Sequence, residues 1–167
     1  VLDGDVLADL VEREEALPLG RPPVAQRQQP RQPAIARPVG RKGERGGAIG
    51  GRLFHHGQEV VLICRGEQLA ALQRGGLTLK TPTDTLQLPI RAVGHPLELS
   101  FTDTDVVILT MKSQDTESAL RDLERAGGSE VPIVCCQNGV DNERMAARRF
   151  SRVYGMVVWM PATYLEP

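Results

Sequence analysis

Short apolar runs alternate with amphipathic segments along the second half of the chain, and this alternation restricts the possible folds more than any other feature. The apolar runs cover residues 59–64, 106–111, 133–136 and 153–160, and the segments with helical spacing between them cover residues 115–126 and 142–150. Runs that are apolar at nearly every position are typical of strands buried on both faces, as in a parallel sheet with helical crossovers. The pattern therefore predicts an α/β fold: a Rossmann-like parallel sheet with helices on both faces.

Local signals complete the set of predicted elements. Residues 68–74 are expected to form a short helix that ends at a Gly-Gly pair. Residues 77–80 and 86–91 are expected to form short strands around a turn. The three cysteines lie within the apolar runs, which predicts buried and reduced thiols, and the single tryptophan, Trp159, is expected in the core of the last strand.

The first 45 residues differ in composition from the rest. No aromatic residue occurs before Phe54, and Arg, Pro, Gln and Gly dominate residues 19–45. Such a segment buries too little apolar surface to offset its ordering entropy. We therefore expect residues 1–45 to form a disordered arm with one short amphipathic helix, and residues 46–167 to form a partial Rossmann domain whose first strand is missing or degraded. A shifted reading frame in a GC-rich gene would produce such an abrupt change, a hypothesis that the DNA sequence would test.

The overall charge argues against two classes of partner. The formal net charge is −1, which attracts neither nucleic acid nor an anionic membrane surface. No apolar run approaches the roughly 20 residues that a spanning helix needs. The N-terminus has no basic flank before an apolar stretch, so the sequence does not indicate a secretory signal. Together with reduced cysteines, these features predict a cytoplasmic protein.

A glycine cluster, Gly46-Gly47-Ala48-Ile49-Gly50-Gly51, is the first candidate binding element. Glycines that open a helix let backbone N–H groups approach a pyrophosphate at the positive end of the helix dipole. The dinucleotide fingerprint also needs a strand immediately before the glycines, and residues 38–45 do not have the pattern of a buried strand. A glycine-rich linker is the alternative interpretation.

Polar residues follow three successive predicted strands, at the sheet edge where parallel folds bind ligands. Arg65 follows the first apolar run, Lys112 the second and Gln137-Asn138-Gly139 the third. In a dinucleotide-binding fold, an arginine at the first of these positions suits a 2′-phosphate and favours NADP over NAD. The alternatives are a solvated surface arginine and, for Asn138-Gly139, a turn with positive φ.

Other polar residues have simpler interpretations. His55 and His56 are expected at the end of the first helix of the domain, where a histidine interacts favourably with the helix dipole. Ser113 has no histidine partner that would indicate a hydrolase. We predict no metal site and assign no catalytic residue.

From Gly46 to Pro167 the chain resembles the N-terminal domain of the ketopantoate reductase (2-dehydropantoate 2-reductase) family. The segments that carry the resemblance are GGAIGGRLF, HGQEVVLICRG, VVILTMKSQD, CCQNGVDNE and YGMVVWMPATYLEP, over nearly three quarters of the chain. The resemblance implies NADPH-dependent reduction of 2-dehydropantoate to pantoate, a step of pantothenate biosynthesis in the cytoplasm.

The resemblance also implies roles for single residues. The glycine loop would hold the pyrophosphate of NADP, and Arg65 would contact its 2′-phosphate. Lys112 would contact the phosphate and ribose side of the cofactor, and Asn138 would lie near the nicotinamide and the keto-acid substrate. The implied cofactor-binding residues are Gly43, Gly46, Gly47, Arg65, Lys112 and Asn138.

Two departures from the family limit the activity expected of this chain. Arg41 occupies the first glycine position of the fingerprint, although Gly43 and Gly46 fall on the other two. The family continues after the position of Pro167 into a helical domain that supplies a general-acid lysine and a substrate-binding glutamate, and we expect that domain to be absent. Because hydride transfer needs proton donation and charge stabilisation at the ketone oxygen, this chain alone is expected to be nearly inactive. The alternatives are a non-catalytic dinucleotide-binding or interaction module and a reductase of another 2-keto acid.

Overall fold

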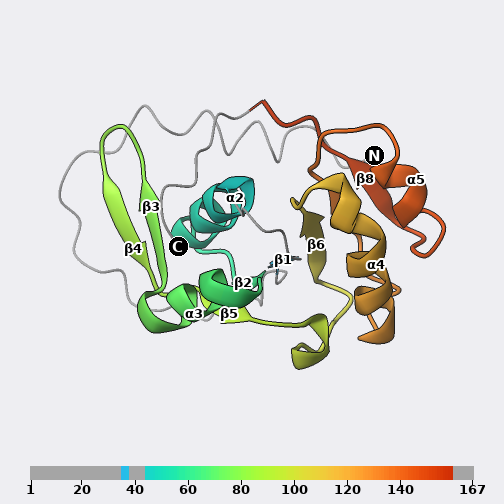
Figure 1. Ribbon diagram of the computed structural model, residues 1–167, viewed down its shortest axis with the longest axis horizontal. Helices are drawn as coiled ribbons and strands as arrows, with labels where there is room; N and C mark the ends of the chain where they lie inside the picture. The colour runs from blue at the N-terminus through green and yellow to red at the C-terminus, as the bar shows by residue number, and fades with distance from the viewer. Residues whose placement is uncertain (1–34, 38–43, 160–167) are drawn as a thin grey trace. The chain divides into compact units, whose positions relative to one another are not determined.

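A six-stranded parallel sheet forms the centre of the compact unit Arg31–Pro167 (Figure 1). The computed structural model describes residues 35–37 and 44–159. The strand order is β5-β2-β1-β6-β7-β8, and every pair of neighbours is parallel. The strands are β1 (Ile35–Arg37), β2 (Val60–Ile63), β5 (Arg91–Val93), β6 (Val106–Leu109), β7 (Ile133–Cys135) and β8 (Val153–Gly155). The Rossmann-like parallel sheet predicted from the sequence is therefore confirmed.

The first strand of the sheet is short but is not missing. β1 lies in the middle of the sheet, where Ile35 is in register with Val60 of β2 and with Val106 of β6. Strands β2 and β6 would otherwise leave backbone hydrogen-bonding groups unpaired at the centre of the sheet. This short strand lies within residues 1–45, which were predicted to form a disordered arm with one short helix. The apolar pair Ile35-Ala36 is too short to be recognised as a strand in an Arg- and Pro-rich stretch. The short helix predicted near the N-terminus lies outside the described residues.

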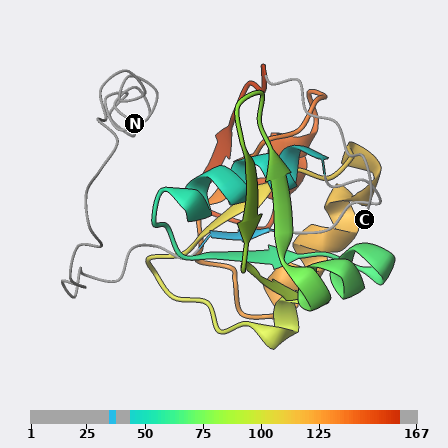
Figure 2. The same cartoon turned by 90° about the vertical axis from the view of Figure 1, so that its left-hand side faces the viewer.

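Helices cover both faces of the sheet, as predicted. One face carries α2 (Glu44–His55), α3 (Gly66–Gly75) and a hairpin of β3 (Leu77–Lys80) and β4 (Thr85–Leu88), and Figure 2 looks onto this face. The other face carries α4 (Thr116–Arg125), α5 (Asn142–Ala146) and the 3-10 turn η2 (Pro96–Glu98).

Strand β2 contributes to the core on both faces because its side chains alternate. Val60 and Leu62 pack with Leu72 of α3 and with the hairpin. On the opposite face, a larger cluster contains Val61, Ile63, Val107, Leu109, Leu120, Leu123 and Ile133. All four residues of β2 are buried, which explains why its sequence is a continuous apolar run.

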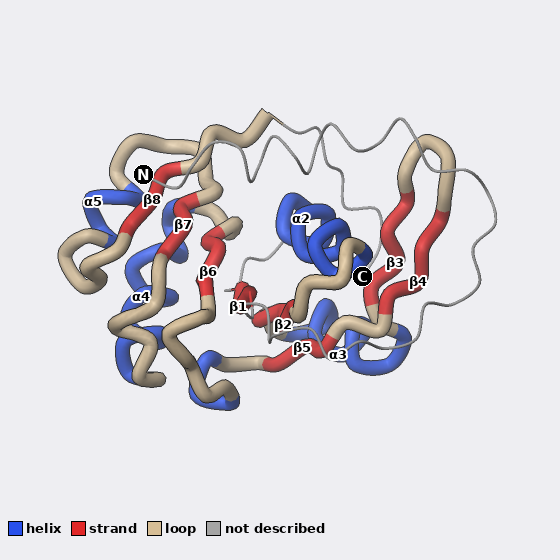
Figure 3. Tube along the Cα trace, turned by 180° about the vertical axis from the view of Figure 1, so that it is seen from behind, coloured by secondary structure: helices blue, strands red, loops and turns tan. Residues whose placement is uncertain are grey.

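The segment predicted as one strand over residues 86–91 belongs to two sheets. β4 pairs antiparallel with β3, whereas β5 pairs parallel with β2 in the main sheet (Figure 3). Pro89, which separates β4 from β5, has no N–H to continue a ladder. The hairpin therefore ends at Leu88, and the chain enters the main sheet three residues later, at Arg91.

The C-terminal elements are shorter than their apolar patterns suggest. β8 ends at Gly155 rather than near residue 160, and α5 ends at Ala146 rather than near residue 150. β8 is an edge strand with one neighbour, so its continuation is not buried on both faces. The expectation that Trp159 lies in the core is wrong, because its side chain is 96% exposed. Among the described residues, no helix is long and apolar enough to cross a membrane.

Candidate functional site

Three exposed polar residues follow the carboxyl ends of β2, β6 and β7. Arg65 comes two residues after the end of β2, Lys112 three residues after the end of β6, and Asn138 three residues after the end of β7. These strands are parallel, so their carboxyl ends lie at one edge of the sheet. The predicted grouping of these residues at that edge follows from the observed topology.

The loops after β6 and β7 are joined directly by hydrogen bonds. The hydroxyl of Ser113, next to Lys112, donates to the backbone oxygen of Asn138 at 2.9 Å, and the Asn142 side-chain amide donates to the same oxygen at 3.2 Å. Gly139 has φ +114°, which agrees with the alternative interpretation of the Asn-Gly pair as a turn. The side chains of Lys112 and Asn138 are thus presented from two loops that are fixed relative to each other.

A network of buried polar side chains also connects these two loops. The amide nitrogen of Gln137 donates to the backbone oxygen of Met111 at 3.0 Å and to the hydroxyl of Thr116 at 2.8 Å. That hydroxyl donates to the side-chain oxygen of Asn142 at 3.0 Å. All three polar side chains are buried, with exposed fractions of 6% for Gln137, 0% for Thr116 and 1% for Asn142. The sequence interpretation missed Thr116 and Asn142, although both occupy the first position of a helix that follows a ligand-edge strand.

One acceptor of this network has no partner among the described residues. The side-chain oxygen of Gln137 is buried and receives no hydrogen bond there. The opposite orientation of the amide would place this oxygen against the carbonyl of Met111, which can only accept. The observed orientation is therefore the better one, and it leaves an acceptor beside Asn138 that a donor group can satisfy.

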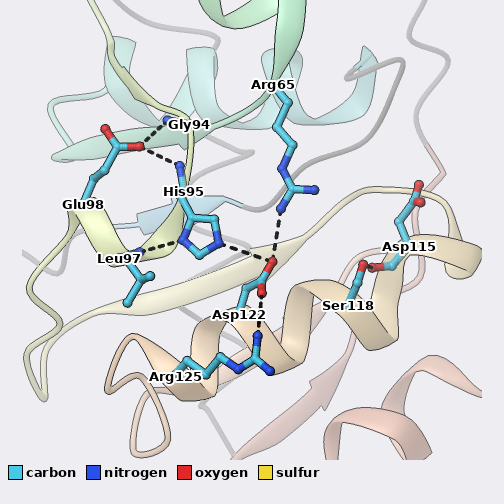
Figure 4. A network of polar contacts seen from close by, with 9 residues as sticks. All are labelled: Arg65, Gly94, His95, Leu97, Glu98, Asp115, Ser118, Asp122 and Arg125. Carbon is cyan, nitrogen blue, oxygen red and sulfur yellow. Dashed lines mark hydrogen bonds and ion pairs between the residues drawn. The ribbon is translucent and has the colours of Figure 1, made fainter.

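The guanidinium of Arg65 contacts a carboxylate on α4 (Figure 4). Arg65 Nη2 lies 3.1 Å from Asp122 Oδ2, and His95 Nε2 lies 3.5 Å from the same oxygen. Arg125 Nη1 lies 3.9 Å from Asp122 Oδ1. Asp122 is 57 residues from Arg65 in the sequence, and no local pattern indicates the contact.

The glycine cluster lies inside α2 rather than in a loop. Gly46 is buried in the first turns of this helix, which starts at Glu44, and Gly43 lies outside the described residues. A Cβ on Gly50 would lie only 2.9 Å from Cδ2 of Leu62 in β2. At least part of the cluster therefore allows close packing of helix and sheet, one of the known uses of glycine in dinucleotide-binding folds.

The three cysteines are buried thiols that form no disulfide, as predicted. Burial, with a smaller contribution from the Glu143 carboxylate, raises the pKa of the Cys135 thiol to about 12. A thiol in this state is a poor nucleophile at neutral pH. Within the described residues, no group of three or more His, Cys, Asp or Glu side chains could hold a metal ion.

The strand order identifies the class of fold. With the hairpin set aside, the order β5-β2-β1-β6-β7-β8 is the doubly wound order 3-2-1-4-5-6 of dinucleotide-binding domains. A short central strand leads toward a helix with glycines in its first turns, and an arginine follows the next strand. The fold is therefore that of the dinucleotide-binding class of α/β domains.

Comparison with known proteins gives the family. Residues 43–167 match the model of the ketopantoate reductase PanE/ApbA family. The chain belongs to this family. It is 29% identical over 116 residues to 2-dehydropantoate 2-reductase from Archaeoglobus fulgidus, and 30% identical over 125 residues to the same enzyme from Pyrococcus horikoshii. A PanE/ApbA family ketopantoate reductase from Ralstonia eutropha superposes with a TM-score of 0.68 at 28% identity.

The match covers only part of each relative. The alignments include 69% of this chain and 36% of the Archaeoglobus enzyme, and 73% of this chain and 39% of the Pyrococcus enzyme. The superposition with the Ralstonia structure includes 77% of this chain and 42% of the Ralstonia chain. The chain therefore spans well under half the length of these relatives.

Proposed function

We propose that the chain is the nucleotide-binding part of an NADPH-dependent reductase that converts 2-dehydropantoate to pantoate. The observation that carries the proposal is the placement of Arg65, Lys112 and Asn138 after three parallel strands of a sheet with the dinucleotide-binding order. Family membership supports the same reaction class. The substrate is a small 2-keto acid, and the site of action is the cytoplasm.

The described residues fit a nicotinamide dinucleotide with a 2′-phosphate. The guanidinium of Arg65 is more than half exposed at the end of β2, with a side-chain exposed fraction of 54%, and can donate to phosphate oxygens. Gly46 and Gly47, in the first turns of α2, bring backbone close to the pyrophosphate. We assign the same role to Gly43, which lies outside the described residues. Lys112 contacts the phosphate and ribose side.

Asn138 is the residue that we assign to both the nicotinamide and the substrate. Two hydrogen bonds fix its backbone oxygen, at 2.9 Å from Ser113 and 3.2 Å from Asn142, while its side chain stays exposed. Its amide is therefore positioned and free to orient a carbonyl group. When bound, the reduced cofactor supplies a hydride to the ketone.

We assign no general acid within this chain. Reduction of a ketone develops negative charge on its oxygen, and a positioned acid contributes about 10²- to 10⁴-fold to such a step. Lys112 is committed to the cofactor in this proposal and does not serve as the acid. The chain is therefore expected to bind nucleotide while turning over substrate very slowly.

A fluorescence titration of the purified chain with NADPH and with NADH tests the proposal. Arg65→Ala should weaken NADPH binding by about 10-fold or more, because it removes charge-assisted hydrogen bonds to the 2′-phosphate, and should leave NADH binding nearly unchanged. Lys112→Ala should weaken both nucleotides alike. Lys80→Ala, an exposed lysine of the β3–β4 hairpin, is the matched control. Binding of neither nucleotide, or an equal effect of Arg65→Ala on both, would contradict the proposal.

A further inference from the structure

We propose that Asp122 determines how strongly the site prefers a nucleotide with a 2′-phosphate. Its carboxylate competes with that phosphate for the guanidinium of Arg65. The inference rests on the proposed function, because it concerns the same cofactor site, and it adds a specificity-determining residue on α4.

The geometry makes Asp122 the fixed partner of the pair and Arg65 the movable one. The Asp122 side chain is 19% exposed, whereas the Arg65 side chain is 54% exposed. The contact of 3.1 Å holds the guanidinium toward α4 (Figure 4). A long arginine side chain keeps its rotamer freedom when it is largely exposed, so Arg65 can exchange one anionic partner for another.

Asp122 keeps other partners when Arg65 leaves. His95 Nε2 at 3.5 Å and Arg125 Nη1 at 3.9 Å remain next to its two oxygens. A carboxylate left with no partner in a largely buried position would be costly, and these two groups avoid that cost. Release of Arg65 is therefore a local exchange of contacts.

His95, which contacts Asp122, is itself held in place by hydrogen bonds. Its Nδ1 accepts the backbone N–H of Leu97 at 3.2 Å, so Nε2 carries the proton that faces Asp122. The carboxylate of Glu98 accepts the backbone N–H groups of Gly94 and His95 at 2.9 Å and 2.8 Å. The turn after β5 thus positions the imidazole against Asp122 independently of Arg65.

The two nucleotides make different demands on this arrangement. The 2′-phosphate of NADPH needs the guanidinium and must displace the Asp122 carboxylate, whereas NADH presents only a hydroxyl there and leaves the contact in place. Removing the carboxylate therefore favours NADPH alone. An ion pair whose arginine is more than half exposed is worth little, so the gain is modest, about two- to fivefold in affinity.

The test is a set of NADPH and NADH titrations on the 167-residue chain with Asp122→Asn, Arg65→Ala and the double variant. Asp122→Asn should bind NADPH about two- to fivefold more tightly than the parent chain and bind NADH within about twofold of it. In the Arg65→Ala background the same substitution should have no effect on NADPH. Asp122→Ala, which suits a helix better than aspartate, should reproduce the result. Asp103→Asn, the same charge change before the amino end of β6, is the control and should change neither affinity.

The outcomes separate this inference from the proposed function. If Arg65→Ala weakens NADPH and Asp122→Asn changes nothing, the cofactor assignment stands and the role of Asp122 is refuted. A parallel change in NADH affinity, or an equal effect of Asp122→Asn with and without Arg65, would also refute it. Binding of neither nucleotide by the parent chain would refute both proposals.

Discussion

Thr116 connects the fold to the site more directly than any residue that binds ligand in our proposal. Its hydroxyl accepts from Gln137 at 2.8 Å and donates to Asn142 at 3.0 Å, so one buried atom joins the loops after β6 and β7. In a low-dielectric interior such bonds are strong, and a group that loses its partner is costly. The position of Asn138 thus depends on a residue that touches no solvent.

Replacing Thr116 with valine tests this network. The valine keeps the shape of the side chain but leaves the Asn142 oxygen and one N–H of Gln137 unpaired, which should lower the free energy of unfolding by about 2–4 kcal/mol. Thr116→Ser keeps the hydroxyl and loses one methyl group, so about 1 kcal/mol is expected. Urea denaturation of both variants gives the comparison, and equal stability of the two would contradict the network.

Cys135 predicts a loss of stability in alkali. Burial raises the pKa of its thiol to about 12 from a reference of 9.0, so above pH 9 the thiol ionises only in the unfolded chain. The stabilisation is complete below about pH 9 and is lost as the pH rises toward 12.

Comparison with Cys135→Ala isolates this contribution. The free energy of unfolding of the parent chain, minus that of the variant, should fall by about 2 kcal/mol between pH 8.5 and 10.5, since each pKa unit corresponds to about 1.4 kcal/mol. Urea titrations across this range measure it. Parallel curves for the two proteins would show that the thiol does not titrate in this way.

At the scale of elements, α2 is a helix that packing must stabilise. It contains four glycines in 12 residues, and each costs about 1 kcal/mol relative to alanine in a helix interior. Leu53 and Phe54 pack against the core shared with β2 and the hairpin, and Gly50 allows the helix to approach Leu62. The same glycines that disfavour an isolated helix thus let α2 lie close to the sheet.

The turn between α3 and β3 depends on a single glycine. Gly76 has φ +72°, and a Cβ there would lie 2.4 Å from the backbone oxygen of Leu88. Gly76→Ala should therefore destabilise the protein by about 3 kcal/mol, from the left-handed backbone and the clash together. Gly127→Ala is the matched control, because Gly127 has φ +81° with nothing within 4 Å, and about 1 kcal/mol is expected. Thermal unfolding measures the loss of stability in each variant. Equal losses in the two variants would contradict the prediction.

At the scale of the whole molecule, the sequence predicts what depends on local periodicity and misses what depends on distant partners. Strands β2, β6 and β7 are buried on both faces, so each is a continuous apolar run. Such a run is enough to predict the strand from the sequence. β1 carries only the apolar pair Ile35-Ala36 and is recognisable only from the two strands that flank it. For the site, the residues after the strands follow from the topology, whereas the Arg65–Asp122 contact joins positions 57 residues apart and leaves no local pattern.

The proposed function makes one central claim about the chain, which is that NADPH binds at the carboxyl edge of the sheet. The segments at this edge are those that follow β2, β6 and β7, at residues 64–66, 110–113 and 136–140. The β3–β4 hairpin and residues 101–105 at the opposite edge provide internal references.

Hydrogen–deuterium exchange of the chain with and without NADPH tests this claim most directly, because bound ligand slows exchange where it contacts or orders the backbone. We predict slower exchange in the three segments that follow β2, β6 and β7, and no change in the hairpin or in residues 101–105. Slower exchange at the opposite edge alone, or no change anywhere at saturating NADPH, would contradict the proposed site.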